Sequence, residues 1–141
     1  MGKKEIHMHQ MIVVYLGNLR TEAQHLESKN IIITDAPKDN QGNGDSFSPT
    51  DLMCTSLASC MLTIAAMKAK SLGIEFQGVR VQVEKKMQAQ PRKVAEVVLQ
   101  FDWQGLDQRI SREHLEALKE AAINCPVALS LDPLLKKTMV W

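Results

Sequence analysis

The residues most able to do chemistry are three cysteines, Cys54, Cys60 and Cys125. A cysteine reacts as the thiolate, and an odd number of cysteines fits reduced thiols better than the disulfide framework of a secreted protein. A free cysteine is also among the most buried residue types and often serves only as a small apolar side chain. From composition alone, both roles remain open.

The surroundings of the three thiols differ. Cys60 lies midway along an apolar segment, and Cys125 directly precedes the helix-breaking Pro126. Cys54 precedes Cys60 by six residues, which on a helix is a rotation of about 240°, so these two thiols do not share a face. We therefore expect Cys54 to pack in the core. His7 and His9 would share one side of a strand, but without a third ligand nearby they predict no metal site.

The 141 residues carry a formal net charge of +1, and apolar residues make up 45% of them. This length fits a single domain over residues 1–141. A nucleic-acid-binding surface needs clustered excess cations, and no run of basic residues exceeds two. The longest charge-free segment, Leu52 to Met67, is shorter than the roughly 20 apolar residues of a membrane span. We therefore expect a cytoplasmic protein that binds neither nucleic acid nor membrane.

Three short strands are predicted before any helix, over Met11–Gly17, Arg20–Glu27 and Asn30–Thr34. Gly17 and Asn18 fit the two-residue turn between the first two strands. The following segment, Asp35 to Ser48, has the composition of a long loop, and such loops are usually functional or mobile.

A long helix follows this loop. Ser48 can cap it, Pro49 suits its first position, and Asp51 stands three residues after the cap, as the acid of a capping box does. Gly73 fits the left-handed position after its end, which gives roughly 23 residues or about 35 Å. Apolar and small residues cover nearly its whole circumference, so a chain of this length needs a partner subunit to bury it.

Strand patterns return over Ile74–Met87, with a bulge expected at Gly78, and again from Val97 to Trp103. Ser111 is expected to cap a second helix, and Lys137–Trp141 to form a last strand. Strands grouped before helices favour an α+β fold with antiparallel sheets.

Two separate strings in this order, SPTDLMCTSLASCM and NCPVALSL, resemble the OsmC/Ohr family of osmotically inducible and organic hydroperoxide resistance proteins. The resemblance extends over most of the chain. It implies an intertwined homodimer, in which antiparallel sheets from both subunits wrap around long central helices. The over-apolar helix is consistent with that arrangement.

By position, the resemblance makes Cys60 the cysteine that attacks the peroxide and Cys125 the cysteine that resolves the product. It makes Arg20 the cation that stabilises the thiolate, since this is the only arginine before the long helix. It implies a thiol-dependent peroxidase that reduces organic hydroperoxides to alcohols through a Cys60 sulfenate and a Cys60–Cys125 disulfide. No bound cofactor is implied, because an external dithiol or lipoyl-type reductant would restore the thiols.

One position departs from the resemblance. The Ohr branch has a glutamate where this chain has Thr50, and the nearest acid is Asp51. Asp51 either pairs with Arg20 in place of that glutamate or only caps the helix. The departure favours the broad OsmC-like branch. It keeps two alternatives open, a non-catalytic dimer that binds a small apolar ligand and a thiol redox sensor.

Overall fold

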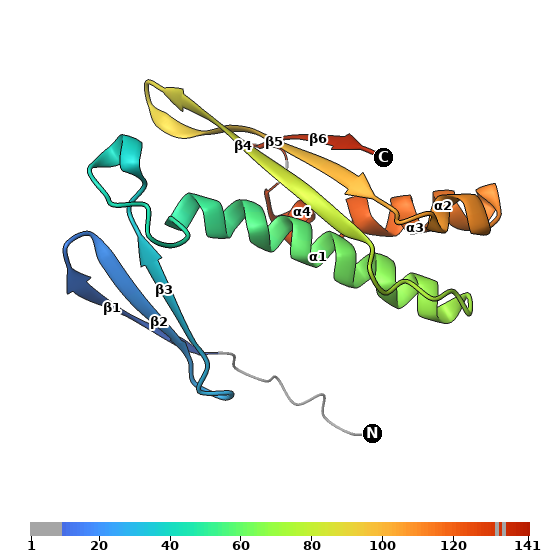
Figure 1. Ribbon diagram of the computed structural model, residues 1–141, viewed down its shortest axis with the longest axis horizontal. Coiled ribbons are helices and arrows are strands. Elements are labelled where there is room, and N and C mark those ends of the chain that lie inside the picture. Colours follow the sequence, from blue (N-terminus) through green and yellow to red (C-terminus); the bar gives the residue numbers. More distant parts are fainter. Residues whose placement is uncertain (1–9, 132, 134) are drawn as a thin grey trace. The chain divides into compact units, whose positions relative to one another are not determined.

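The computed structural model describes residues 10–131, 133 and 135–141. These residues form two compact units that meet along the chain between Leu52 and Met53. Each unit has its own three-stranded sheet (Figure 1). Two small sheets combined with helices make this an α+β fold, as the sequence predicted.

The sheet of the first unit is the antiparallel meander expected from the sequence. It consists of β1 (Met11–Gly17), β2 (Arg20–His25) and β3 (Ile31–Asp35), in that order. A 3-10 turn, η1 (Lys38–Asn40), lies in the loop that follows. The predicted strands are thus confirmed to within two residues at each end.

The turn between β1 and β2 differs from the prediction by one residue. Gly17 pairs with Arg20, so the two turn residues are Asn18 and Leu19, with φ angles of 54° and 61°. Two left-handed residues in succession define a type I′ turn, whose twist matches that of the flanking strands. Leucine is unusual there because its Cβ makes this conformation costly, which is why the sequence pattern favoured Gly17–Asn18.

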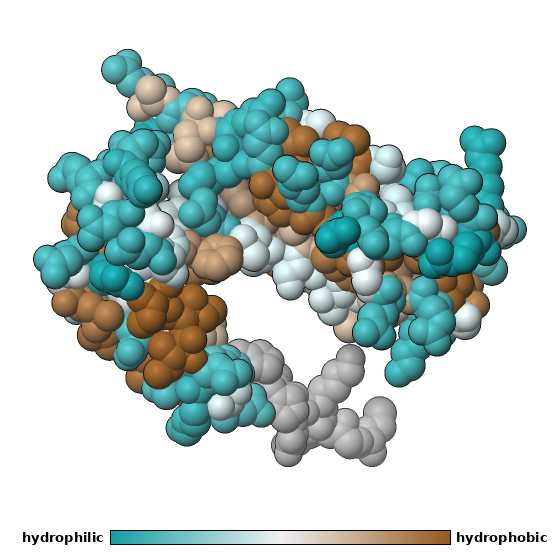
Figure 2. Space-filling view, viewed as in Figure 1, coloured by the Kyte–Doolittle hydropathy of each residue, from teal (hydrophilic) through white to brown (hydrophobic). Residues whose placement is uncertain are grey.

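The first sheet is apolar and open to solvent. All six residues from Met11 to Leu16 are about half exposed or more, and so are Ile31 and Ile32. Figure 2 shows apolar side chains gathered over this sheet. A contiguous exposed apolar surface of this kind marks an interaction site.

The long helix α1 (Pro49–Ser71) has the ends that the sequence predicts. The backbone N–H of Asp51 donates to Ser48 Oγ at 3.1 Å, and the N–H of Ser48 donates to Asp51 Oδ2 at 2.9 Å, which is a reciprocal capping box. At the other end Gly73 has a φ of 69°, and the N–H of Ile74 donates to the carbonyl of Ala69 at 2.9 Å. These are the features of a Schellman cap.

One stripe of α1 is buried within the chain. Its members recur every three or four residues and are Cys54, Leu57, Ala58, Met61, Ala65 and Ala69. By length and composition alone, α1 could cross a membrane, and only 33% of its most apolar 18-residue window is buried. A core helix of a water-soluble protein passes the same test, so α1 is weak evidence for a membrane span.

The second unit contains a sheet of order β4 (Arg80–Ala89), β5 (Arg92–Asp102) and β6 (Lys136–Val140). Between β5 and β6 the chain forms α2 (Leu106–Arg109), α3 (Arg112–Ile123) and α4 (Pro126–Leu131). Ser111 caps α3 by accepting from the N–H of His114, as predicted.

The pairing of β5 with β6 corrects one expectation. These strands run parallel, with Glu96 opposite Lys136 and Gln100 opposite Val140, so this sheet is mixed rather than wholly antiparallel. A parallel pair requires a long crossover connection. The three helices between β5 and β6 supply that connection.

The predicted bulge at Gly78 is also wrong. No strand covers residues 74–79, and β4 begins only at Arg80. Gly78 has a φ of 96°, and the N–H of Val79 donates to the carbonyl of Phe76, so this stretch is a turn. The register shift in β4 lies between Lys86 and Met87 instead.

The core of the second unit joins the sheet to the helices. In Figure 1, β4, β5 and β6 lie along the part of α1 that belongs to this unit. Val97 and Leu99 of β5 and Leu118 and Ala122 of α3 are completely buried. These contacts hold the residues around Cys125 against α1.

Candidate functional site

The second unit brings together two of the predicted site residues, Cys60 of α1 and Cys125. Their side chains lie close enough to interact with each other, although about 65 residues separate them along the chain. Both are free thiols. Cys125 is completely buried, whereas Cys60 is half-buried at the edge of the core.

The junction between α3 and α4 fixes the position of Cys125. Its N–H donates to the carbonyl of Ala122, and its carbonyl accepts from Leu129 in the first turn of α4. The N–H of Ala128 donates to Cys125 Sγ at 3.4 Å. Because proline tolerates the first turn of a helix, Pro126 allows α4 to start immediately after the cysteine. The thiol is therefore held by backbone groups on both sides.

The environment of Cys125 favours the neutral thiol. Burial is the largest cause that raises its pKa, and the interaction with Cys60 raises the pKa further. The backbone N–H groups of Ala128 and Val127 oppose this by stabilising the thiolate. The balance of these causes raises the pKa of Cys125 above its ordinary value.

Cys54 belongs to the core, as the sequence predicted. It is 2% exposed and lies on the buried stripe of α1.

The other two predicted site residues, Arg20 and Asp51, belong to the first unit. Arg20 begins β2, and its Nη1 lies 3.8 Å from Asp45 Oδ2. Asp51 takes part in the capping box with Ser48, so the capping role anticipated for it is confirmed. His7 and His9 lie outside the described residues.

Two residues beside Arg20 have no counterpart in the sequence prediction. Asp45 pairs with Arg20, and Asp35 accepts a hydrogen bond from the backbone of Asp45 at 2.9 Å. Both lie at the ends of the segment that the sequence marked only as a long loop. Aspartate is common in loops for many reasons, so no pattern in the sequence singles out these two.

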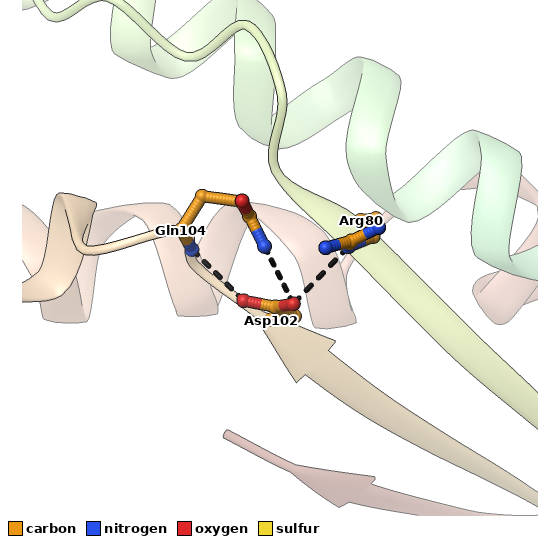
Figure 3. A network of polar contacts seen from close by, with 3 residues as sticks. All are labelled: Arg80, Asp102 and Gln104. Atoms are coloured by element: carbon orange, nitrogen blue, oxygen red, sulfur yellow. Dashed lines mark hydrogen bonds and ion pairs between the residues drawn. The ribbon is translucent and has the colours of Figure 1, made fainter.

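A surface depression of about 630 Å³ lies elsewhere in the second unit, at one end of β4 and β5. Asp102 there accepts hydrogen bonds from Arg80 Nε at 3.1 Å and from the backbone and side chain of Gln104 (Figure 3). None of the residues that line the depression is a predicted site residue. These polar contacts hold the ends of two strands together.

The thiol pair can carry out dithiol–disulfide chemistry. Two reduced cysteines whose side chains interact can close a disulfide after one of them is oxidised. The raised pKa of Cys125 keeps this thiol protonated at neutral pH.

Comparisons with known proteins place this geometry in a family. The family model described as OsmC-like protein matches residues 42–136, a range that runs across the boundary between the two units. Among curated proteins, no relative matches the chain significantly.

Several solved structures are similar to the chain. A candidate osmotic stress induced and detoxification response protein from Psychrobacter arcticus 273-4 has 44% identity and a TM-score of 0.84, with 98% of each chain covered. The organic hydroperoxide resistance protein OsmC of Legionella pneumophila has 15% identity and a TM-score of 0.70, with 97% of this chain and 98% of that chain covered.

A third structure, the organic hydroperoxide resistance protein OhrB of Bacillus subtilis, also has 15% identity, with a TM-score of 0.62 and 96% and 98% coverage. At this identity, the Legionella and Bacillus structures show a shared fold. The family match and the 44% identical structure confirm the resemblance seen in the sequence. The chain therefore belongs to the family of OsmC-like proteins, which includes organic hydroperoxide resistance proteins.

Proposed function

We propose that this protein is a thiol-dependent peroxidase that reduces organic hydroperoxides to alcohols. One observation carries the proposal, the pair of interacting free thiols at Cys60 and Cys125. A core that needed only two small apolar side chains would not require two thiols in contact. The names of the Legionella and Bacillus structures, organic hydroperoxide resistance proteins, support the substrate class.

The reaction begins with the thiolate of Cys60. Its sulfur attacks the terminal oxygen of the hydroperoxide, the O–O bond breaks, and the alkoxide leaves and takes up a proton to become the alcohol. The sulfur is oxidised to a sulfenic acid, and the peroxide is reduced. Cys60 suits this step because it is only half-buried, so a substrate can reach it.

Cys125 then closes the cycle. Its sulfur attacks the sulfenic sulfur of Cys60, a disulfide forms, and water leaves with the thiol proton. An external dithiol, of which a lipoyl group is one kind, reduces the disulfide by exchange and is itself oxidised. This reaction cycle uses no bound cofactor or metal. Burial protects Cys125 from direct oxidation until its partner has reacted.

Arg20 has the role of the cation beside the reacting sulfur. A guanidinium is always charged and can both stabilise a thiolate and hold a peroxide oxygen. Asp51 remains a candidate acid near Arg20 because both belong to the first unit. We place the assembled protein in the cytoplasm as a homodimer, in which a second copy covers the exposed apolar residues of β1 and α1.

The test is the consumption of cumene hydroperoxide by purified protein in the presence of dithiothreitol. We expect turnover by the wild type and none by Cys60→Ser. Cys125→Ser should reduce about one equivalent of peroxide and then stop, with Cys60 trapped as a sulfenic or sulfinic acid. The matched control is Cys54→Ala, which removes a thiol from the same helix and should keep the activity.

Thiol titration separates the peroxidase from a dimer that only binds a ligand. A stoichiometric dose of peroxide should remove two of the three thiols per chain, and a dithiol should restore both. Equal inactivity of wild type and Cys60→Ser, with all three thiols retained, would overturn the proposal.

A further inference from the structure

The first unit contains an ion pair whose acidic member, Asp45, has no role in the peroxidase scheme. Arg20 Nη1 lies 3.8 Å from Asp45 Oδ2, and the side chains are 36% and 58% exposed. Arg20 follows directly after the left-handed residues Asn18 and Leu19. A strained turn of this kind gives the first residue of β2 a defined starting direction.

The position of Asp45 depends on a buried carboxylate. The N–H of Asp45 donates to Asp35 Oδ2 at 2.9 Å, and Asp35 is completely buried. Its other oxygen, Oδ1, is buried without a hydrogen-bond partner. Burying such an oxygen is unfavourable, so the fold retains Asp35 at a cost.

Arg20 and Asp35 are direct partners across β2 and β3. Cross-strand partners project from the same face of a sheet. The carboxyl group of Asp35 is therefore on the face of the sheet from which Arg20 projects.

Backbone contacts of the loop between β3 and α1 hold this arrangement in place. The N–H of Ala36 donates to the carbonyl of Leu19 at 3.1 Å, which ties the start of the loop to the turn before Arg20. Gly44 donates back to Ala36 at 3.2 Å. A Cβ on Gly42 would lie 1.7 Å from the carbonyl oxygen of Ala36, so only glycine fits there. The loop thus returns Asp45 to the side of Arg20.

We propose that Asp45 is the positioning residue for the Arg20 guanidinium and that Asp35 fixes Asp45 in place. The inference rests on the function proposed above, in which Arg20 stabilises the reacting sulfur. Arginine has a long side chain with many rotamers, and a carboxylate that holds one of them reduces the ordering required when substrate binds. Asp45 touches neither substrate nor sulfur in this proposal and acts only through Arg20.

The experiment compares the wild type with Asp45→Asn, which keeps the shape and removes the charge, and with Asp45→Glu, which keeps the charge. Asp102→Asn is the matched control, because it removes an exposed aspartate that pairs with Arg80 within the second unit. The same substitutions are made in an Arg20→Gln background. Circular dichroism and thermal melting establish that each variant is folded.

The first measurement is the hydrogen exchange of the Arg20 Nη–H groups, one of which faces Asp45, by NMR with guanidinium-labelled arginine, and it requires no activity. Because exposed ion pairs are of modest strength, we expect this hydrogen exchange to be about two- to fivefold faster in Asp45→Asn. Asp45→Glu should restore most of the protection, and Asp102→Asn should leave it unchanged. A loss of loop structure alone would not be repaired by glutamate.

The second measurement is the rate constant for oxidation of Cys60 by cumene hydroperoxide in a single turnover. We expect Asp45→Asn to lower it about tenfold, since small misplacement of a catalytic group costs that much or more. In the Arg20→Gln background, Asp45→Asn should have no further effect. This non-additivity separates positioning of Arg20 from a general loss of stability.

The outcomes distinguish the two proposals. If Arg20→Gln is slow and Asp45→Asn reacts like the wild type, the positioning role is wrong and the peroxidase proposal stands. If the wild type does not reduce peroxide, the peroxidase proposal fails, and Nη–H exchange alone decides whether Asp45 positions Arg20. Unchanged exchange in Asp45→Asn overturns the positioning role in either case.

Discussion

At the scale of single residues, the environment of Cys125 determines when this thiol can react. The pKa of Cys125 is raised chiefly by burial, and contact with Cys60 adds to that effect. The thiol that resolves a sulfenic acid must stay protonated and unreactive until the first step is complete. In this protein burial at the junction of α3 and α4 supplies most of that restraint.

Alkylation measures this restraint. We expect the iodoacetamide reaction of Cys125 to reach its half-maximal rate above the ordinary cysteine pKa of about 8.5. In Cys60→Ala the half-maximal pH should fall but stay raised, because burial is the larger cause. A titration of Cys125 at or below the ordinary value would contradict the burial argument.

The same shift has a consequence for stability. Since the folded protein raises the pKa of Cys125, its contribution to the free energy of unfolding is fully present below the unfolded pKa. It is lost as pH rises through the folded value. Urea midpoints of the wild type should therefore decline from neutral to alkaline pH more steeply than those of Cys125→Ala.

Asp102 makes the free energy of unfolding depend on pH in the opposite direction. The backbone N–H of Gln104 is the largest cause that lowers its pKa, followed by Arg80 (Figure 3). A lowered pKa stabilises the fold above the unfolded value, and this stabilisation disappears as pH falls through the folded value. The difference in urea midpoint between wild type and Asp102→Asn should therefore shrink on acidification. Arg80→Gln should keep the part that Gln104 supplies.

At the scale of elements, local signals in the sequence predicted the helix ends well. Ser48, Asp51 and Gly73 act through backbone groups within a few residues of themselves, so their patterns could be interpreted without the fold. The strands of the first unit were predictable for the same reason. The parallel pairing of β5 with β6 was not, because it joins residues some 40 positions apart.

The candidate site was predictable to a similar extent. The sequence indicated Cys60 and Cys125 through their strings and their resemblance, and the structure shows them in contact. The pairing of Arg20 with Asp45 depends on how a 13-residue loop folds back, and no local pattern encodes that path. The turn at Asn18–Leu19 was misplaced because tertiary hydrogen bonds to Leu19 override its own preference.

Substitution of two glycines by alanine tests what holds the helix end and the loop in place. Gly73→Ala places a Cβ in open space, so only the left-handed φ of 69° opposes it, at a cost of about 1–2 kcal/mol. Gly42→Ala forces a clash with the backbone of Ala36 and should cost more. Chemical denaturation of both variants gives the order. Equal costs would show that the loop around Gly42 moves freely.

At the scale of the whole molecule, the exposed apolar surface of β1 sets the main expectation. Single chains rarely leave six consecutive apolar residues half exposed. We expect a homodimer in sedimentation equilibrium, with a melting temperature that rises with protein concentration. Val13→Lys should weaken the dimer, whereas Thr63→Ser should preserve it. A wild-type monomer at micromolar concentration would contradict the proposed assembly.

The crossover from β5 to β6 also determines when the thiol pair can form. The hairpin of β4 and β5 closes locally, whereas β6 docks only after α2, α3 and α4 have been laid down. Long-range pairing is entropically slow. During synthesis on the ribosome, Cys60 therefore emerges without its companion. If an oxidant reacts with Cys60 on the nascent chain, no second thiol is in place to form the protective disulfide. Only the fully folded protein has this protection.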